Sequence, residues 1–200
     1  GRASGNGPRL VTLHYRPQAP ATAIRLGLVG KAVTFDSGGY FLKSSAQIGV
    51  EKADMAGGAA VLAALGAIAE LRLPIEVFAV IPAAENALGE HAYRPGDILT
   101  MASGTTVEIS NPDAEGRLLL ADALTHVQRL GATHLVDVAT LTGAVVTALG
   151  DFYAGLFTND DEWRDALLAA GETSGDRLWP LPLDPRYRSM IDSQLADLRN

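Results

Sequence analysis

Apolar and polar positions follow two patterns that alternate along the chain. Short runs rich in valine, leucine and isoleucine, bounded by proline, glycine or charged residues, predict strands. Longer runs in which apolar residues recur at helical spacing, ended by proline or glycine, predict helices. The predicted strands cover 9–15, 24–35, 75–82, 105–110 and 134–141, and the predicted helices cover 57–73, 115–130 and 163–172.

The alternation of strands and helices defines the expected fold class. Repeated βα units favour a parallel sheet that is covered by helices on both faces. We therefore predict an α/β fold, a three-layer α/β/α arrangement with a mixed, largely parallel sheet. No internal repeat, low-complexity tract or linker interrupts the 200 residues, so we expect residues 1–200 to form one domain, long enough to bury a core.

Composition narrows the classes of function. Hydrophobic residues make up 48% of the chain and charged residues 20%, which is typical of a globular protein. The net charge of −7 and the lack of any Lys/Arg-rich run argue against a nucleic-acid partner. The absence of cysteine excludes disulfides and thiolate metal sites. No apolar run approaches the roughly 18 residues of a membrane span, so we expect a soluble, cytoplasmic protein without a membrane partner.

Four acids stand at the predicted strand ends or helix starts, where sites in α/β sheets lie. They are Asp36, Asp54, Asp113 and Glu115. Each alone is explained as a helix cap, because the amides and dipole of a helix start stabilise an anion. Together they would repel one another unless a cation lay among them. Hard divalent cations prefer carboxylate oxygens, so the pattern predicts a metal site with enough ligands for two ions.

Basic residues accompany these acids, whereas the histidines do not. Lys31 and Lys43 flank Asp36 in the sequence, and Arg117 follows Glu115 by two positions. The four histidines fall in a loop, in an amphipathic helix and on strands, away from the acidic segments, and we expect none of them to be a ligand.

The segment "NPDAEGRL" (residues 111–118) resembles the NTDAEGRL signature of the leucyl aminopeptidases, the M17-type cytosol aminopeptidases. That octapeptide is highly specific. The similarity runs in the same order from about Leu10 to the last residue, and so it covers nearly the whole chain. The other matching stretches are "VGKAVTFDSGG", "KADMAGGAAVLAA", "IPAAENALGEHAYRPGDIL", "LADALTHV", "DVATLTGA" and "SQLADLRN".

The resemblance implies a ligand set for two divalent ions. Lys31, as a neutral amine, and Asp54 would bind one ion, and Asp113 would bind the other. Asp36 and Glu115 would bridge the pair. Manganese, zinc and magnesium all accept such a set. The family's activity is removal of N-terminal residues from peptides by a metal-activated water.

The resemblance also implies two catalytic side chains. Lys43 matches an active-site lysine that would stabilise the developing oxyanion. Arg117 matches an active-site arginine, which would hold a bicarbonate-like anion that carries the proton of the water. The alternative for Arg117 is an ordinary ion pair with Asp113 or Asp122.

Substrate contacts are implied at Thr140, Leu141 and Gly143, although "ATLTGA" would also serve as a plain strand-to-helix turn. Glu51 stands where the family often has a methionine that lines the pocket for the first substrate side chain. We therefore expect a more polar pocket that accepts basic or polar residues besides leucine. The alternative is that Glu51 points into solvent.

Other positions depart from the family pattern or support it. Pro112 replaces a threonine before the ligand Asp113, and Ser44 replaces a proline, which should loosen the loop after Lys43. We expect Glu85, at a strand end, to support the site. The glycine pair 57–58 should let a helix approach the sheet closely, and the pair 38–39 lacks the Lys-Ser/Thr of a phosphate-binding loop.

The chain is shorter than the subunits of the family that it resembles, and two other functions are alternatives to a peptidase. Family subunits carry a separate N-terminal domain and a longer catalytic domain, so the resemblance implies part of that domain, truncated at its C-terminus, from a hexameric peptide-cleaving enzyme. A metal-dependent phosphoesterase is the first alternative, because two carboxylate-bridged ions also suit phosphoryl transfer. An inactive scaffold that retains the fold is the second. The presence of all seven expected metal-site and catalytic residues argues against decay.

Overall fold

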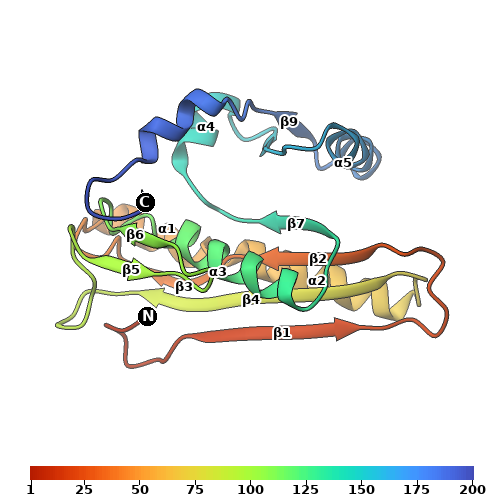
Figure 1. The fold of residues 1–200 in the computed structure, drawn as a ribbon, viewed down its shortest axis with the longest axis horizontal. Helices are drawn as coiled ribbons and strands as arrows, with labels where there is room; N and C mark the ends of the chain where they lie inside the picture. The colour runs from red at the N-terminus through yellow and green to blue at the C-terminus, as the bar shows by residue number, and fades with distance from the viewer. The chain divides into compact units, whose positions relative to one another are not determined.

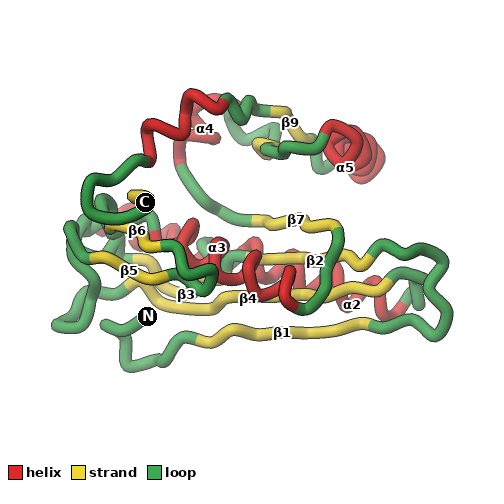
Figure 2. The backbone as a smooth tube through the Cα atoms, viewed as in Figure 1, coloured by secondary structure: helices red, strands yellow, loops and turns green.

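A computed structural model describes residues 1–200 of the chain (Figure 1). The residues form two compact units, one made of Gly1–Leu141 with Ser193–Asn200 and the other of Thr142–Asp192. Figure 2 shows strands and helices alternating along the backbone of the first unit, which confirms the predicted α/β fold class.

The first unit is built on a five-stranded sheet in which β4 has partners on both sides. β1 pairs with β4 in antiparallel orientation, whereas β2 and β3 pair with it in parallel, and β7 pairs in parallel with β2. The sheet is therefore mixed and largely parallel, as predicted. Its strands are β1 (Arg9–Tyr15), β2 (Arg25–Gly30), β3 (Ala32–Asp36), β4 (Glu76–Asn86) and β7 (His134–Val138).

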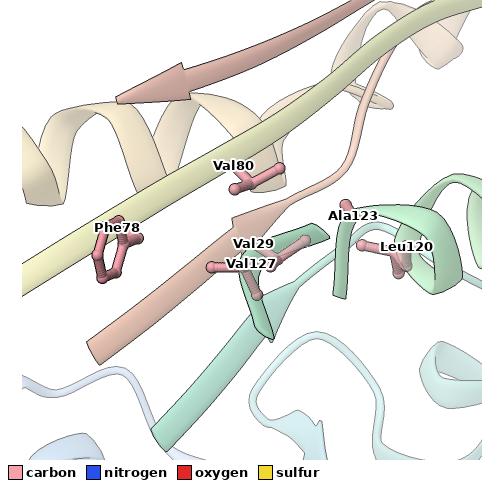
Figure 3. Close-up of a cluster of buried hydrophobic side chains, with 6 residues drawn as sticks. All are labelled: Val29, Phe78, Val80, Leu120, Ala123 and Val127. Atoms are coloured by element: carbon pink, nitrogen blue, oxygen red, sulfur yellow. The ribbon is translucent and has the colours of Figure 1, made fainter. Parts of the chain in front are cut away.

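Two long helices cover the sheet, and each packs into its own apolar cluster. The alanine- and leucine-rich α2 (Ala56–Glu70) packs Val61 and Leu65 against one group of sheet residues. α3 (Glu115–Arg129) presents apolar residues at helical spacing to another. Figure 3 shows this second cluster, in which helix and strand side chains converge. Its buried members are Val29, Phe78, Val80, Leu120, Ala123 and Val127.

The predicted strand 24–35 is interrupted at Lys31. The Lys31 amide donates to the Val138 carbonyl of β7 (3.0 Å), and the Lys31 carbonyl accepts from the Gly58 amide (2.7 Å). A Cβ added at Gly57 would lie 2.0 Å from the Val138 oxygen, so only glycine permits this approach. The close approach expected of the glycine pair 57–58 is confirmed, and it fixes the backbone that carries Lys31.

Short elements complete the first unit. α1 (Ser45–Val50) is capped by Ser44. The Ser44 hydroxyl accepts from the Gln47 amide, and the Gln47 side chain accepts from the Ser44 amide. This capping box corrects the expectation that Ser44 loosens the loop, because the residue starts a helix instead. The other elements are η1 (Glu51–Ala53) and a small sheet of β5 (Ile98–Thr100), β6 (Thr106–Glu108) and β10 (Leu198–Arg199).

The second unit contains three helical segments and one parallel strand pair, β8 with β9. Asp160 caps α5 through the Trp163 amide (2.8 Å), and Gly175 ends it with a φ of 86°. The predicted helix 163–172 is therefore present and extends slightly beyond the prediction at each end. The elements are α4 (Gly143–Leu149), β8 (Ala154–Leu156), α5 (Asp161–Ser174), β9 (Leu178–Pro180) and η2 (Pro185–Ile191).

One helical segment, Ser45–Glu70, is long and apolar enough to cross a membrane by length and composition alone. It includes α1, η1 and α2, carries the buried Asp54, and places Val61 and Leu65 in the core against the sheet. A core helix of a folded domain meets the same criterion, so length and composition alone are weak evidence for a membrane span.

Candidate metal centre

The candidate centre lies where β3 ends and where α2 and α3 begin. Asp36 ends β3, Asp54 directly precedes α2, and Glu115 is the first residue of α3. Each of these three buried side chains offers one carboxylate oxygen, and the three atoms lie within 4.8 Å of one another. The structure thus brings together three of the five predicted metal ligands in one cluster.

Lys31 forms one buried part of this centre, with 3% of its surface exposed. Its ammonium donates to Asp54 Oδ1 (2.6 Å) and to the Thr140 carbonyl (3.0 Å), and it lies 3.4 Å from Glu115 Oε1. The Thr140 hydroxyl also donates to Asp54 Oδ1 (2.8 Å). Thr140 is therefore joined to the predicted ligands through both its backbone and its side chain.

Gly116 makes room for the Lys31 side chain. A Cβ added at Gly116 would lie 2.6 Å from Lys31 Cε, closer than real contacts allow. The glycine inside "NPDAEGRL" is thus a packing requirement of the site. The motif itself gives no indication of this, because the contact joins segments 85 positions apart.

Lys43 forms a second part of the centre, nearer the surface. Its ammonium contacts Asp36 Oδ2 in a short hydrogen bond, lies 2.9 Å from Asp113 Oδ1 and lies 3.2 Å from Glu51 Oε1. The contact with Asp113 is an ion pair without hydrogen-bond geometry, since Asp113 Oδ1 has no hydrogen-bond partner. Through Lys43, Asp113 and Glu51 are joined to Asp36.

A tight turn brings Lys43 to this position. Gly38 has a φ of 81°, and a Cβ there would lie 2.4 Å from the Phe41 carbonyl oxygen. The Phe41 amide donates to the Gly38 carbonyl (3.1 Å), and the Lys43 amide donates back to the Ser37 carbonyl (2.9 Å). The glycine turn after β3 therefore folds the chain back so that Lys43 faces Asp36.

Two neighbours at the end of β4 behave differently. Glu85 accepts from the Ser4 hydroxyl and from Asn6 Nδ2 (2.9 Å), so the expectation that it supports the centre is wrong. Asn86 donates instead to Asp36 and Glu115. Successive side chains of a strand point to opposite faces, and only one of the two can reach the cluster. The expected residue was off by one position.

The turn that carries Asp113 is held from two distant segments. Asn200 Oδ1 accepts from the Asn111 amide (3.0 Å), and Asn200 Nδ2 donates to the Asn111 carbonyl (2.8 Å). The Tyr93 hydroxyl donates to the Pro112 carbonyl (3.0 Å). Pro112 has no amide hydrogen to satisfy, and it is fully buried. The matching end "SQLADLRN" thus contributes to the centre through its last residue.

The charges of the centre are incompletely balanced. Burial raises the pKa of Asp54, Glu115 and Asp113, even though Lys31 and Lys43 act against the rise. For Lys43, burial lowers the pKa, but the contacts with Asp36 and Asp113 outweigh it, so its pKa is raised and it stays an ammonium. Asp54 Oδ2 is buried without any hydrogen-bond partner. Added positive charge would stabilise these carboxylates.

Three predicted residues are not joined to the cluster. Arg117 is exposed on the first turn of α3 and forms no ion pair with Asp113 or Asp122; the latter accepts from the Ala102 amide (2.7 Å). Leu141 is exposed in the loop that follows β7, and Gly143 begins α4 in the second unit. Their roles remain predictions.

The fold and the donor set together define an α/β domain with a buried cluster of carboxylates, the ligand type that hard divalent cations prefer. Carboxylates from three segments converge, two buried carboxylate oxygens lack a hydrogen-bond partner, and no histidine contributes to the cluster. Oxygen-rich sets of this kind suit magnesium, manganese and zinc.

Comparison with known proteins places this domain in a family. The family model described as "Cytosol aminopeptidase family, catalytic domain" matches residues 1–200, and the chain belongs to that family. The chain is 54% identical to a probable cytosol aminopeptidase of Solibacter usitatus over 197 residues, 98% of this chain and 41% of the relative. It is 52% identical to one of Roseiflexus castenholzii over 200 residues, 100% of this chain and 41% of the relative. The chain thus spans about two fifths of the length of these relatives.

Proposed function

We propose that this domain carries the two-metal centre of an aminopeptidase that hydrolyses N-terminal residues from peptides. The observation that supports it most strongly is the meeting of Asp36, Asp54 and Glu115 within 4.8 Å. Membership of the cytosol aminopeptidase family supports the same reaction class. The rival phosphoesterase gains no support from any contact in the centre.

Five side chains would hold the two ions. Lys31 and Asp54, which already contact each other, would hold one ion, and Asp113 would hold the other. Asp36 and Glu115, which lie between Lys31 and Lys43, would contact both. When bound, such ions supply an activated water, because they lower its pKa toward neutrality. Manganese, zinc and magnesium are the candidate ions.

Lys43 would stabilise the oxyanion that develops at the scissile carbonyl. Its ammonium now neutralises Asp36 and Asp113, the carboxylates that we assign to metal binding. Lys43 also contacts Glu51, which lies outside the proposed ligand set and would remain its carboxylate partner with ions bound. A fixed ammonium beside the reacting carbonyl is the kind of group that contributes most to such catalysis.

Arg117 and the segment after β7 would complete the site. The exposed guanidinium of Arg117 is unpaired and available to hold a bicarbonate-like anion, which would accept the proton of the water. Thr140 lies against Lys31 and Asp54, at the edge of the centre. We propose that Thr140, Leu141 and Gly143 contact the backbone and first side chain of the peptide.

Glu51 would determine which first residue is accepted. Its carboxylate does not simply point into solvent, because it lies 3.2 Å from the Lys43 nitrogen. An acid at the rim of the site favours basic or polar first residues over strict leucine specificity. Turnover of leucine, methionine, lysine and arginine anilides tests this, with Glu51→Met as the matched variant. A strong leucine preference in the wild type would contradict it.

The protein would act as a homo-oligomer in the cytoplasm on peptides with free N-termini. The names of the relatives, probable cytosol aminopeptidases, support the location and the peptide substrate, whereas the hexamer is what the family resemblance implies. Light scattering after size-exclusion chromatography tests the assembly, and a monomer would contradict it.

Leucine p-nitroanilide hydrolysis, with and without Mn²⁺ or Zn²⁺, tests the proposed reaction. We expect metal-dependent turnover in the wild type and none in Asp113→Ala, whose carboxylate faces the centre. Turnover that is independent of metal, or that survives in Asp113→Ala, would contradict the proposal. Hydrolysis of p-nitrophenyl phosphate without peptidase activity would favour the phosphoesterase instead.

A further inference from the structure

The amide of Asn86 lies at the middle of the centre, although no part of the proposed chemistry uses it. Asn86 ends β4 and is buried, with 7% of its surface exposed. Its Nδ2 lies 3.0 Å from Asp36 Oδ1, 2.9 Å from Glu115 Oε2 and 3.1 Å from the Pro112 carbonyl oxygen. One side chain therefore contacts the end of β3, the start of α3 and the turn before Asp113.

The chemistry of these neighbours fixes which way the amide faces. Carboxylates and a carbonyl accept hydrogen bonds, so the nitrogen of Asn86 must face them. The NH₂ group carries two hydrogens, and three acceptors share them. The donor is neutral, so it satisfies the two carboxylates without a positive charge that would compete with a metal ion.

Asn86 contacts only one oxygen of each carboxylate. Asp36 Oδ1 accepts from Asn86 and from the Gly38 amide (2.9 Å), whereas Asp36 Oδ2 contacts Lys43. Glu115 Oε2 accepts from Asn86, whereas Glu115 Oε1 faces Lys31 at 3.4 Å. Asp36 and Glu115 therefore have the same arrangement: one oxygen of each carboxylate contacts the neutral amide of Asn86, and the other contacts a lysine ammonium.

The backbone of Asn86 is fixed to the same segment. Asn86 is the register partner of Asp36 in the pairing of β3 with β4. Its carbonyl accepts from both the amide (2.9 Å) and the hydroxyl (2.8 Å) of Ser37. A Cβ at Gly39 would lie 3.2 Å from Asn86 Oδ1, so the glycine leaves space for the amide. The position of the donor relative to Asp36 is thus set by the sheet.

We propose that Asn86 is a positioning residue, which orients Asp36 and Glu115 so that both turn their second oxygens toward the metal-binding side. This inference rests on the proposed function, because it concerns the two carboxylates that would contact both ions. Hydrogen-bond partners of metal ligands typically contribute roughly 10- to 100-fold to metal affinity or activity.

Manganese binding to Asn86→Ala, compared with the wild type, tests the proposal. We expect the wild type to bind two Mn²⁺ by calorimetry and to give the electron paramagnetic resonance signal of two coupled ions. Asn86→Ala should lose affinity by about 10- to 100-fold and lose the coupled signal. Unchanged affinity and an unchanged signal would overturn the proposal, whereas a wild type that binds no manganese would overturn the proposed function as well.

Tyr93→Phe is the matched control. The Tyr93 hydroxyl donates to the Pro112 carbonyl, which Asn86 also contacts, but it touches neither carboxylate. If Asn86 acts through the carboxylates, Tyr93→Phe should stay within about twofold of the wild type, since one neutral hydrogen bond contributes little. An equal loss in both variants would overturn the proposal in favour of a role in holding the turn.

A measurement on the wild type keeps the test decisive if Asn86→Ala does not fold. Nitrogen-15 spectra report the side-chain NH₂ of Asn86 in the presence of Zn²⁺. We expect both hydrogens to resist exchange with solvent in the zinc-bound protein, because two carboxylates hold them. Rapid exchange of both hydrogens would show that the amide is not engaged and would overturn the proposal.

Discussion

The two lysines of the centre lie in different surroundings, although both contact carboxylates. The side chains of Lys31 and Asp54 are 4% and 3% exposed, and Gly116 and Thr140 enclose them. The side chain of Lys43 is 13% exposed, and its partners Asp113 and Glu51 are 30% and 25% exposed. The first pair is part of the core between sheet and helices, whereas the second is held by a surface turn. The same chemical contact should therefore contribute differently to stability and to exchange with solvent.

Removing Lys31 should have the largest effect. Lys31→Met leaves Asp54 and Glu115 as buried charges without their cation, which typically costs about 3–5 kcal/mol of unfolding free energy. Lys43→Met should cost less, because two of its three carboxylate partners, Glu51 and Asp113, reach solvent. The third, the buried Asp36, keeps hydrogen bonds from Asn86 and the Gly38 amide. Urea unfolding of both variants in EDTA measures the difference. Equal losses of unfolding free energy, or a larger loss for Lys43→Met, would contradict the stated difference between the surroundings of Lys31 and Lys43.

Filling the space beside Lys31 should have the next largest effect. The added methyl of Gly116→Ala would lie 2.6 Å from Lys31 Cε, and overpacking of this kind costs about 1–3 kcal/mol. Gly66→Ala is the control, because Gly66 lies inside α2 with no atom near its added methyl. It should stabilise the chain by about 0.5–1 kcal/mol. Thermal unfolding measures both, and a neutral Gly116→Ala would contradict the packing described here.

The part of the centre around Lys31 and the part around Lys43 should also release metal ions at different rates. An ion held by the enclosed Lys31 and Asp54 should exchange more slowly than one held by the more open Asp113. We therefore expect Asp113→Asn to keep one tightly bound Mn²⁺ and Asp54→Asn to lose it, with affinities that differ by roughly tenfold or more. Equilibrium dialysis followed by metal analysis measures the retained ion. If Asp113→Asn and Asp54→Asn retained the same amount of Mn²⁺, the predicted difference between the two metal sites would be contradicted.

The smallest predicted effect concerns pH in the metal-free chain. Burial first, and then the charge of Asp36, raise the pKa of Glu115 above its ordinary value. The folded state therefore binds this proton more tightly than the unfolded state, and stability falls as pH rises through the raised pKa. Glu115→Gln should remove the contribution of Glu115 to this pH-dependent loss of stability. Acids with a lowered pKa, such as Glu76, act in the opposite direction but are common to both proteins.

Urea unfolding in EDTA across the acidic and neutral range gives the difference between wild type and Glu115→Gln. The difference should grow in favour of Glu115→Gln as pH rises. A difference that is constant with pH would contradict the raised pKa of Glu115.

The repeating pattern of the sequence was sufficient for the sheet and the long helices. β1 matches its prediction over Arg9–Tyr15, and α3 begins at the predicted Glu115. Both rest on local periodicity, which a single sequence displays. The break at Lys31 and the short strand β10 were not predicted, because they depend on partners far along the chain. The strand β5 pairs with the nearby β6, but its three residues are too few to display a period.

The candidate centre was predictable to the extent that its residues are charged and stand in specific motifs. The contacts among Lys31, Asp36, Asp54 and Glu115 agree with that prediction, although the ligand roles stay proposals. Asn86 carries no charge and belongs to no metal-binding pattern, so nothing in the sequence distinguished it from Glu85. Which of two neighbours faces the cluster depends on the register of β4 against β3.

Anomalous X-ray diffraction from crystals of the chain grown with Mn²⁺ tests the central claim most directly. We expect two manganese peaks, one in contact with Lys31 and Asp54 and the other in contact with Asp113, with Asp36 and Glu115 in contact with both. We also expect that Lys43 no longer contacts Asp113. No peak among these carboxylates, with Lys43 still paired to Asp36 and Asp113, would contradict the assignment of this cluster as a two-metal centre.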